Sequence, residues 1–287
     1  MKLSEMKQLL AEHNLHLTKS LGQNFLHDGN QLRRIVAAAE LNPSDKVLEI
    51  GPGLGPLTKL LLEQAGEVLA LEKDRRFVEL LSKGRSHQPG VSNQQDRKWG
   101  KLHVINADAL DFLRKETRDW QDWKLVANLP YSVASPILVE MAFANRGPER
   151  LVVTLQLEVA KRLMAKAGAA DYGVLTLLVQ FAYEPIRFFK IPASCFFPEP
   201  EVDSACVCLL RRPQPLLTVG QKPLFVKIIK RSFSQRRKMM LKLLRQDWPK
   251  QTLAAAFEEL QLSPETRAEE VSLEKFAELT EVLSRSA

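Results

Sequence analysis

Residues 128–131, Asn-Leu-Pro-Tyr, combine the groups needed to hold an aromatic amine. Pro130 keeps Leu129 extended and has no N–H of its own, so the local backbone offers carbonyl acceptors. Asn128 adds a side-chain carbonyl oxygen, and two rigid acceptors match the two hydrogens of an exocyclic amine. The ring of Tyr131 offers a face for base stacking, worth about 1–3 kcal/mol per base. The motif therefore predicts a site for an aromatic amine, although asparagine and proline also occupy ordinary turns.

The chemistry expected at this motif is transfer of a group to the amine of adenine. That amine is a weak nucleophile because its lone pair is delocalised into the ring. Hydrogen bonds to the oxygens of Asn128 and Leu129 would favour a tetrahedral nitrogen whose lone pair points at an electrophile. Catalysis would then depend on orientation and preorganised dipoles, without a strong base. The target base must first leave its stack.

A glycine-rich loop and two acidic residues predict a nucleoside pocket on the same edge of the fold. Gly51 and Gly53 lie between a strand and a helix, where glycine lets the backbone approach a ligand closely. Glu72 ends the next strand and can accept both hydroxyl hydrogens of a ribose. Asp108 ends the third strand and can accept from an adenine amino group. Taken singly, the glycines could form a tight turn and the acids could be solvated charges or helix caps.

The features of this pocket favour S-adenosylmethionine as the cofactor. The glycine spacing is GxGxG rather than the dinucleotide pattern GxGxxG, and the sequence contains no GxxxxGK[ST] motif. Because the sulfonium and amino groups of S-adenosylmethionine are positive, Glu49 and the acids of the pocket would attract it. We therefore expect a methyltransferase that needs no metal.

The alternation of strands and helices from about residue 30 to 210 predicts an α/β fold with a parallel sheet covered on both faces. Prolines after residue 211 indicate a boundary between a catalytic domain, residues 1–212, and a helical domain, residues 213–287. Residues 85–100 are predicted to form a polar surface loop. Strands are expected at 46–51, 67–74, 102–108, 123–131, 150–157, 184–192 and 204–212, and helices at 31–41, 56–66, 75–84, 135–145 and 172–183.

The composition suits a polyanionic partner and a cytoplasmic location. Lys and Arg outnumber Asp and Glu by 41 to 34, and the net charge is +7. The N-terminus lacks the apolar core of a signal peptide, and no apolar run reaches the roughly 20 residues that span a bilayer. Cys195, Cys206 and Cys208 form no CxxC pair and are expected to be small core residues of a protein in a reducing compartment.

The segment from Lys227 to Arg245 contains eight basic residues and no acidic one. On a helix it would form a basic stripe beside an apolar face, which is usually just a solvated surface. The lack of compensating acids favours contact with RNA phosphates instead. The first candidates for this contact are Arg236, Arg237 and Lys238.

A series of segments from about residue 18 to 280 resembles the rRNA adenine N6,N6-dimethyltransferases, in particular their bacterial KsgA branch. The resemblance implies a Rossmann-like class I methyltransferase sheet with a small C-terminal helical RNA-binding domain. The matching segments are KSLGQNFLHD, EIGPGLGPLT, LEKD, NADAL, NLPYSVASPIL, FFPEPEVDSA and FSQRRKMMLKLL.

The resemblance also assigns roles to individual residues. It implies that the target base lies between Tyr131 and Phe196, although Phe196 would otherwise be read as a core aromatic. It adds two residues of the N-terminal motif to the cofactor site. The residues implied to hold the cofactor are Asn24, Leu26, Gly51, Gly53, Glu72, Asp108 and Asn128.

The implied reaction is dimethylation of two adjacent adenosines near the 3′ end of 16S rRNA, on an immature 30S-type particle and coupled to its maturation. A monomer is expected. Two alternatives remain open at this point. One is the same chemistry on large-subunit rRNA, as in enzymes that confer macrolide resistance. The other is a nucleic-acid-binding factor, such as an assembly chaperone, that needs no catalysis.

Overall fold

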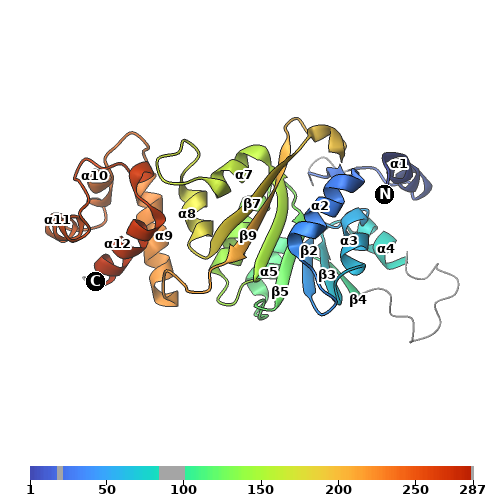
Figure 1. The fold of residues 1–287 in the computed structure, drawn as a ribbon, viewed down its shortest axis with the longest axis horizontal. Coiled ribbons are helices and arrows are strands. Elements are labelled where there is room, and N and C mark those ends of the chain that lie inside the picture. The colour runs from blue at the N-terminus through green and yellow to red at the C-terminus, as the bar shows by residue number, and fades with distance from the viewer. Residues whose placement is uncertain (18–21, 84–100, 286–287) are drawn as a thin grey trace. The chain divides into compact units, whose positions relative to one another are not determined.

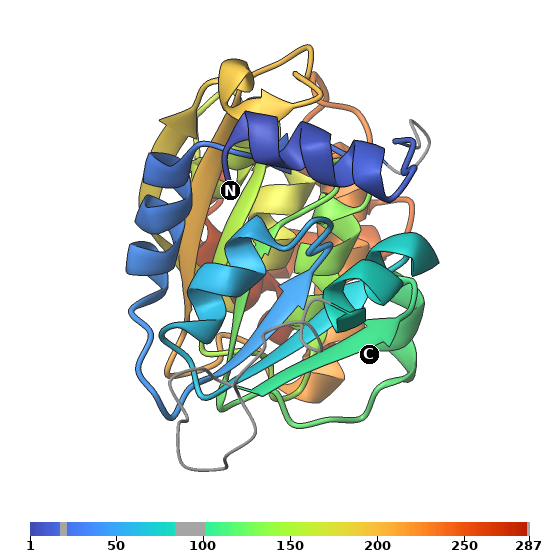
Figure 2. The ribbon, with the colours of Figure 1, turned by 90° about the vertical axis from the view of Figure 1, so that its right-hand side faces the viewer.

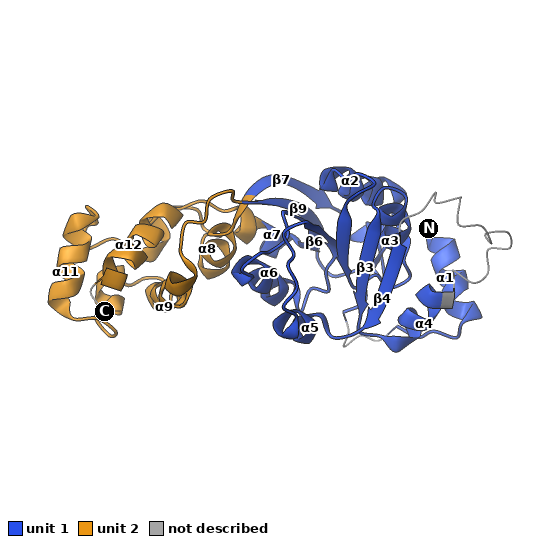
Figure 3. Ribbon diagram, turned by 90° about the horizontal axis from the view of Figure 1, so that it is seen from below, with its two compact units in different colours: residues 1–160, 185–211 blue, residues 161–184, 212–287 orange. Residues whose placement is uncertain are grey.

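The computed structural model describes residues 1–17, 22–83 and 101–285 (Figure 1). The first residues of the N-terminal motif, 18–21, and the expected loop at 85–100 lie outside these ranges. The chain divides into two compact units, residues 1–160 with 185–211 and residues 161–184 with 212–287 (Figure 3). The sequence predicts one boundary near residue 212, whereas the structure also groups residues 161–184 with the second unit.

The first unit is built on a mixed sheet, which in the described residues has the strand order β4-β3-β2-β5-β6-β9-β7. β2 pairs in parallel with β3 and β5, and the parallel set continues to β4 on one side and β6 on the other. The strands are β2 Lys46–Ile50, β3 Glu67–Glu72, β4 Lys101–Asn106, β5 Trp123–Asn128, β6 Arg150–Gln156, β7 Tyr183–Ile191 and β9 Ser204–Arg211.

The expected parallel arrangement does not extend to β9, which runs antiparallel to β6. A parallel strand is usually reached through a crossover helix. The connection from β7 to β9 contains only the 3-10 turn Ala193–Cys195 and the two-residue strand β8, Phe196–Phe197. β8 pairs instead with β1, Phe25–Leu26, in a small antiparallel ribbon.

Helices cover both faces of the sheet, as predicted (Figure 3). α2, Gly29–Ala39, and α3, Pro56–Leu62, lie on one face, while α5, Ala109–Lys115, and α6, Ala134–Phe143, lie on the other. α4, Arg75–Lys83, packs beside β4. The sequence did not predict α1, Leu3–Glu12, α5 or α7, Leu157–Met164. α5 has seven residues, which is too short for a clear helical period.

One hydrophobic cluster of the first unit lies between α2, α3 and the sheet. It includes Ile35, Val47, Val126 and Val152, all at most 1% exposed. Cys206 and Cys208 belong to the same cluster, which confirms that they are core residues. A second cluster packs α1 against β1, α4 and the loop that follows β2. Figure 2 shows α1 lying across that end of the sheet.

The second unit is helical. Its helices are α8 Val174–Gln180, α9 Lys222–Ser232, α10 Met240–Leu244, α11 Lys250–Glu259 and α12 Leu273–Arg285. The continuous basic helix expected over residues 227–245 is wrong, because residues 233–239 form turns between α9 and α10. The ring of Phe233 packs against Tyr172 and Phe276 at this break. None of the helices in the described ranges has the length and apolarity required to cross a membrane.

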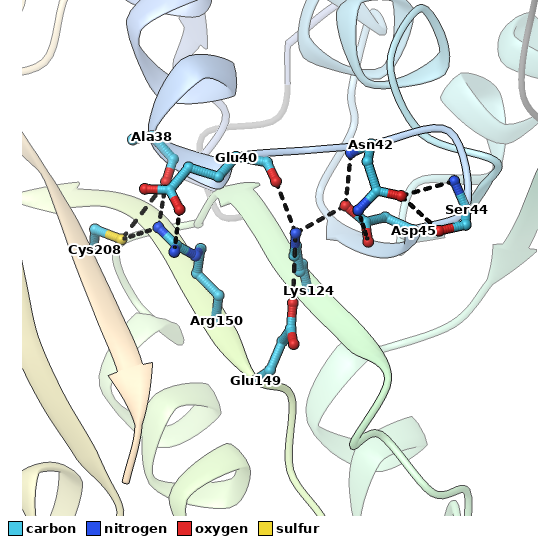
Figure 4. Close-up of polar contacts among 9 residues, drawn as sticks. All are labelled: Ala38, Glu40, Asn42, Ser44, Asp45, Lys124, Glu149, Arg150 and Cys208. Carbon is cyan, nitrogen blue, oxygen red and sulfur yellow. Dashed lines mark hydrogen bonds and ion pairs between the residues drawn. The ribbon is translucent and has the colours of Figure 1, made fainter. Parts of the chain in front are cut away.

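A polar network closes the sheet at the amino ends of its central strands (Figure 4). The Lys124 side chain is only 8% exposed, and its Nζ lies 2.8 Å from both Asp45 Oδ2 and the Glu40 carbonyl oxygen. Glu149 Oε1 lies 3.4 Å from the same nitrogen. Arg150, at the start of β6, donates to the Ala38 carbonyl at 3.0 Å and also pairs with Glu40. These contacts fasten β5 and β6 to the loop between α2 and β2.

We expect Lys124→Ala to lower the free energy of unfolding by about 3 kcal/mol, because it leaves the largely buried Asp45 without its cationic partner. Urea denaturation followed by circular dichroism measures this change. The control is Lys59→Ala, which removes an exposed lysine from α3. Equal stability of the two variants would contradict a structural role for the network.

Candidate active site

A pocket opens where the central parallel strands end at their carboxyl termini. β2 and β5 are neighbours in the sheet, but the chain leaves them in opposite directions, toward β3 and toward β6. Ligands of open α/β sheets bind at such a switch point. The structure brings nine of the predicted site residues to the lining of this pocket: Asn24, Gly51, Gly53, Glu72, Asp108, Asn128, Leu129, Pro130 and Tyr131.

The loop after β2 requires glycine at two positions of the pocket. Gly51 and Gly53 have φ angles of +70° and +56°, which L-residues with side chains rarely adopt. A Cβ at Gly53 would lie 2.3 Å from the Phe25 ring, and one at Gly51 would lie 3.5 Å from Pro130. The loop thus packs directly against the N-terminal segment and the Asn-Leu-Pro-Tyr motif.

Glu72 is held rigidly at the end of β3. Its two carboxylate oxygens accept from the backbone N–H groups of Gly53, at 3.0 Å, and Asp74, at 2.8 Å. The side chain is 7% exposed, and burial raises its pKa above the usual value. A carboxylate has about four lone-pair sites, so two remain for hydroxyl donors of a ligand.

Asp108 has a structural role as well as a place in the pocket. Its Oδ1 caps α5 by accepting from the N–H groups of Leu110 and Asp111, so the helix-cap alternative is correct for this oxygen. Oδ2 lies 3.0 Å from Nζ of Lys73. That hydrogen bond lowers the pKa of Asp108, which therefore remains ionised at neutral pH. Lys73 is itself 62% exposed, so a ligand can displace its side chain.

The amide of Asn128 is oriented by the N-terminal segment. Its Nδ2 donates to the carbonyl oxygen of Asn24 at 2.9 Å. Its Oδ1 is buried and has no hydrogen-bond partner among the described residues. A buried acceptor without a partner costs about 1–3 kcal/mol, so this oxygen is the feature of the pocket that most needs a donor. In the same motif, the Leu129 N–H donates to Thr154 and the Pro130 carbonyl accepts from Val133.

Tyr131 follows in the turn before α6, with its hydroxyl 2.5 Å from Oγ of Ser204 on β9. The ring is partly buried, and desolvation raises the pKa of the phenol. Its position at the lining of the pocket is compatible with stacking on a base.

Two predicted residues do not line the pocket. Leu26 and Phe196 are 2% and 3% exposed and belong to the core beneath α2. They face each other in the β1–β8 ribbon. Phe196 is therefore a packing residue in this structure, and its contact with a base stays a prediction.

The three basic candidates lie in the turns between α9 and α10 of the second unit. All three are exposed. Arg236 donates to the Ala170 carbonyl at 2.7 Å and lies 3.8 Å from Glu269, so it braces neighbouring loops. The basic segment 227–245 contains no acidic residue, but acids from other parts of the chain pair with it. Glu269 lies near Arg236, and Asp247 pairs with Arg231.

Sequence reasoning missed several residues of the pocket. Phe25 and Phe77 form one wall, with their rings edge to face at a centroid separation of 5.5 Å. Gln23 donates to Asp74 at 3.1 Å and ties the N-terminal segment to the loop after β3. Phe77 stands in no sequence pattern that distinguishes a pocket wall from core. Gln23 and Phe25 lie within the N-terminal motif QNF, which was the available signal.

The comparison with known proteins identifies the family. The sequence model of the family described as ribosomal RNA adenine dimethylase matches residues 14–285. The chain belongs to this family. Its members include the ribosomal RNA small subunit methyltransferase A of Latilactobacillus sakei, which is 36% identical over 285 residues, covering 97% of this chain and 93% of that relative. The Enterococcus faecalis protein of the same name is 37% identical and covers 99% and 96%.

Solved structures agree with this membership and with a class I methyltransferase fold. A dimethyladenosine transferase from Plasmodium falciparum is 25% identical with a TM-score of 0.74, covering 89% of this chain and 95% of that one. The 23S rRNA methyltransferase ErmE is 29% identical with a TM-score of 0.66, covering 91% and 99%.

Members of this dimethylase family use S-adenosylmethionine, and the pocket fits that cofactor. It is lined by the carboxylates of Glu72 and Asp108 and by the backbone at Gly51 and Gly53. These groups suit a ligand with ribose hydroxyls and positive charge. Among the described residues, no group of three or more His, Cys, Asp and Glu side chains is arranged to hold a metal ion.

Glu49 departs from the expectation that it would attract a cation. It is 1% exposed, does not line the pocket, and its Oε2 lacks a hydrogen-bond partner in the described chain. Burial raises its pKa from 4.5 to about 8, with a smaller contribution from the nearby Glu72. The carboxyl is therefore mostly protonated at neutral pH, and the attraction falls to Asp108 and Glu72.

We expect Glu49 to make the folded protein less stable as the pH rises from about 4.5 to about 8. Across this range the unfolded carboxyl loses its proton while the folded one keeps it, so the free energy of unfolding falls by a few kcal/mol. Glu49→Gln removes this fall, and urea denaturation at a series of pH values measures it. The control is Glu63→Gln, at an exposed position after α3. An unchanged pH slope in Glu49→Gln would refute the buried neutral carboxyl.

Proposed function

We propose that the chain transfers methyl groups from S-adenosylmethionine to the N6 amines of two adjacent adenosines near the 3′ end of small-subunit rRNA. Family membership and the small-subunit names of its relatives support this substrate. The observation that carries the proposal is the buried Oδ1 of Asn128, which lacks a donor in the described residues and belongs to a residue that lines the pocket.

The residues of the Asn-Leu-Pro-Tyr motif hold the amine in a reactive geometry. Oδ1 of Asn128 and the carbonyl of Leu129 accept its two hydrogens, which favours a tetrahedral nitrogen with an exposed lone pair. Tyr131 supports the face of the base by stacking. The bound cofactor supplies an electrophilic methyl group. The amine proton leaves to water once the nitrogen has become positive, so no residue needs to act as a strong base.

The cofactor is held by the rim of the sheet. Glu72 accepts from the ribose hydroxyls, and Asp108 accepts from the adenine amino group after Lys73 moves aside. The amino acid portion of S-adenosylmethionine lies beside Gly51, Gly53 and the carboxamide of Asn128. Asn24 acts by orienting Asn128, since its carbonyl accepts from Nδ2 at 2.9 Å, and Leu26 supports that segment from the core.

The C-terminal helical unit binds RNA in this proposal. Arg237 and Lys238 are exposed in the turn after α9 and contact phosphates. Arg236 contributes charge while bracing the loop at Ala170. In this proposal the protein acts as a monomer on an immature 30S-type particle. It acts in the cytoplasm, because that is where such particles are found.

We expect Asn128→Ala to retain the fold and to lower kcat by at least about 100-fold, because the amine loses a preorganised acceptor. Single-turnover transfer from tritiated S-adenosylmethionine measures the rate. The substitution has two opposing effects on stability. It removes the hydrogen bond to the Asn24 carbonyl, which is unfavourable, and it removes a buried oxygen without a partner, which is favourable. We therefore expect the thermal midpoint to fall by no more than the loss of one hydrogen bond explains.

Asn145→Ala is the matched control, since Asn145 is exposed after α6 and does not line the pocket. It should show normal turnover. A rate for Asn128→Ala within a few-fold of this control would exclude Asn128 as the principal acceptor.

The substrate is tested by incubating the protein with tritiated cofactor and immature small subunits, large subunits or protein-free rRNA, followed by mapping of the labelled nucleotides. We expect N6,N6-dimethyladenosine at two adjacent positions near the 3′ end of small-subunit rRNA. Label confined to large-subunit rRNA would favour the activity of ErmE, which the structure also resembles. Cofactor binding without transfer to any substrate would favour a binding factor.

A further inference from the structure

The hydroxyl of Tyr131 makes a partly buried contact that the proposed mechanism does not use. It lies 2.5 Å from Oγ of Ser204, and either oxygen can be the donor. Ser204 is 0% exposed and does not line the pocket, so it cannot reach a ligand there. A side chain in this position can influence the reaction only through Tyr131.

Ser204 is itself fixed by the sheet. It opens β9 opposite Gln156 of β6, in the antiparallel ladder. The residue before it, Asp203, accepts from the N–H of Ala193 at 2.9 Å and pairs with Lys190 at 2.6 Å. Its carbonyl also accepts from the N–H of Leu157. The Ser204 hydroxyl is therefore attached to a rigid support, whereas Tyr131 lies in a turn.

The hydroxyl contact is the second of two tethers on the Asn-Leu-Pro-Tyr motif. The first joins Nδ2 of Asn128 to the Asn24 carbonyl, at the entrance to β1. β1 pairs with β8, which lies a few residues before Ser204 in the chain. The two tethers thus attach one end of the motif to the segment that enters β1 and the other end to the start of β9.

We propose that Ser204 is a positioning residue for methyl transfer, because its hydroxyl fixes the ring of Tyr131 and thereby sets the orientation of the adenine that stacks on it. This inference rests on the proposed function. A misplacement of about 1 Å in a reacting group can lower the rate about 100-fold. A hydrogen bond that fixes the stacking ring can therefore affect the rate of methyl transfer.

The second methylation depends on this tether more than the first. The unmodified amine has two hydrogens for the two acceptors of the motif, whereas the monomethylated amine has only one. With one hydrogen bond fewer, the orientation of the base relies more on the Tyr131 ring. At each step one N–C bond forms, the S–C bond of the cofactor breaks, and one amine proton passes to water.

The test compares Ser204→Ala, Tyr131→Phe and the double variant, using immature small subunits and mass spectrometry of monomethyl and dimethyl products. We expect each single variant to lower kcat about tenfold and to accumulate monomethyladenosine, with the KM for the cofactor within about twofold of the wild type. The double variant should be no worse than either single one, because both substitutions remove the same hydrogen bond.

Thr280→Val serves as a control, since it removes another fully buried hydroxyl, one that donates to Phe276 within α12. It should give the wild-type ratio of products. Additive losses in the double variant, or an unchanged product ratio in Tyr131→Phe, would overturn the inference even if Ser204→Ala folds poorly. Failure of the wild-type protein to methylate the particle would instead refute the proposed function.

Discussion

The arrangement of the pocket depends on one hydrogen bond, from Nδ2 of Asn128 to the carbonyl of Asn24. An amide has one donor end and one acceptor end, so committing the nitrogen decides where the oxygen points. That oxygen is buried without a partner in the described part of the chain, at a cost that folding alone does not recover. Such an acceptor becomes favourable only when a ligand supplies a donor, which is the property required of a site for an amine.

The rest of the first unit holds the Asn-Leu-Pro-Tyr motif and its unpartnered acceptor in place. The strand order brings the ends of β2, β3 and β5 together, and the Lys124 network fastens the opposite ends of the central strands. The loop at Gly53 packs against Phe25, and this contact joins the N-terminal segment to the loop that borders the pocket. Two buried groups near the pocket oppose folding: the carboxyl of Glu49 and the unpartnered oxygen of Asn128.

Much of this arrangement could be predicted from sequence because the relevant patterns are local. Apolar strands ending in Gly51, Glu72 and Asn128 specify both the strands and the shared edge on which these residues lie. The antiparallel direction of β9 and the partner of Tyr131 could not be predicted, because they arise between segments far apart in the chain. The protonated state of Glu49 also depends on burial, which motif spacing does not report. The break at Phe233 arises from packing against Tyr172 and Phe276, so a run of basic residues gave no sign of it.

The central claim is that the oxygen of Asn128, rather than its nitrogen, faces the target amine. Neutron diffraction of the protein with adenosine and S-adenosylhomocysteine bound tests it most directly, because it locates the amide hydrogens that X-ray maps rarely resolve. The account predicts that Nδ2 carries its hydrogens toward Asn24 and that Oδ1 lies about 2.7–3.2 Å from the adenosine N6. An amide turned the other way, or an N6 group bound only by other acceptors, would contradict it.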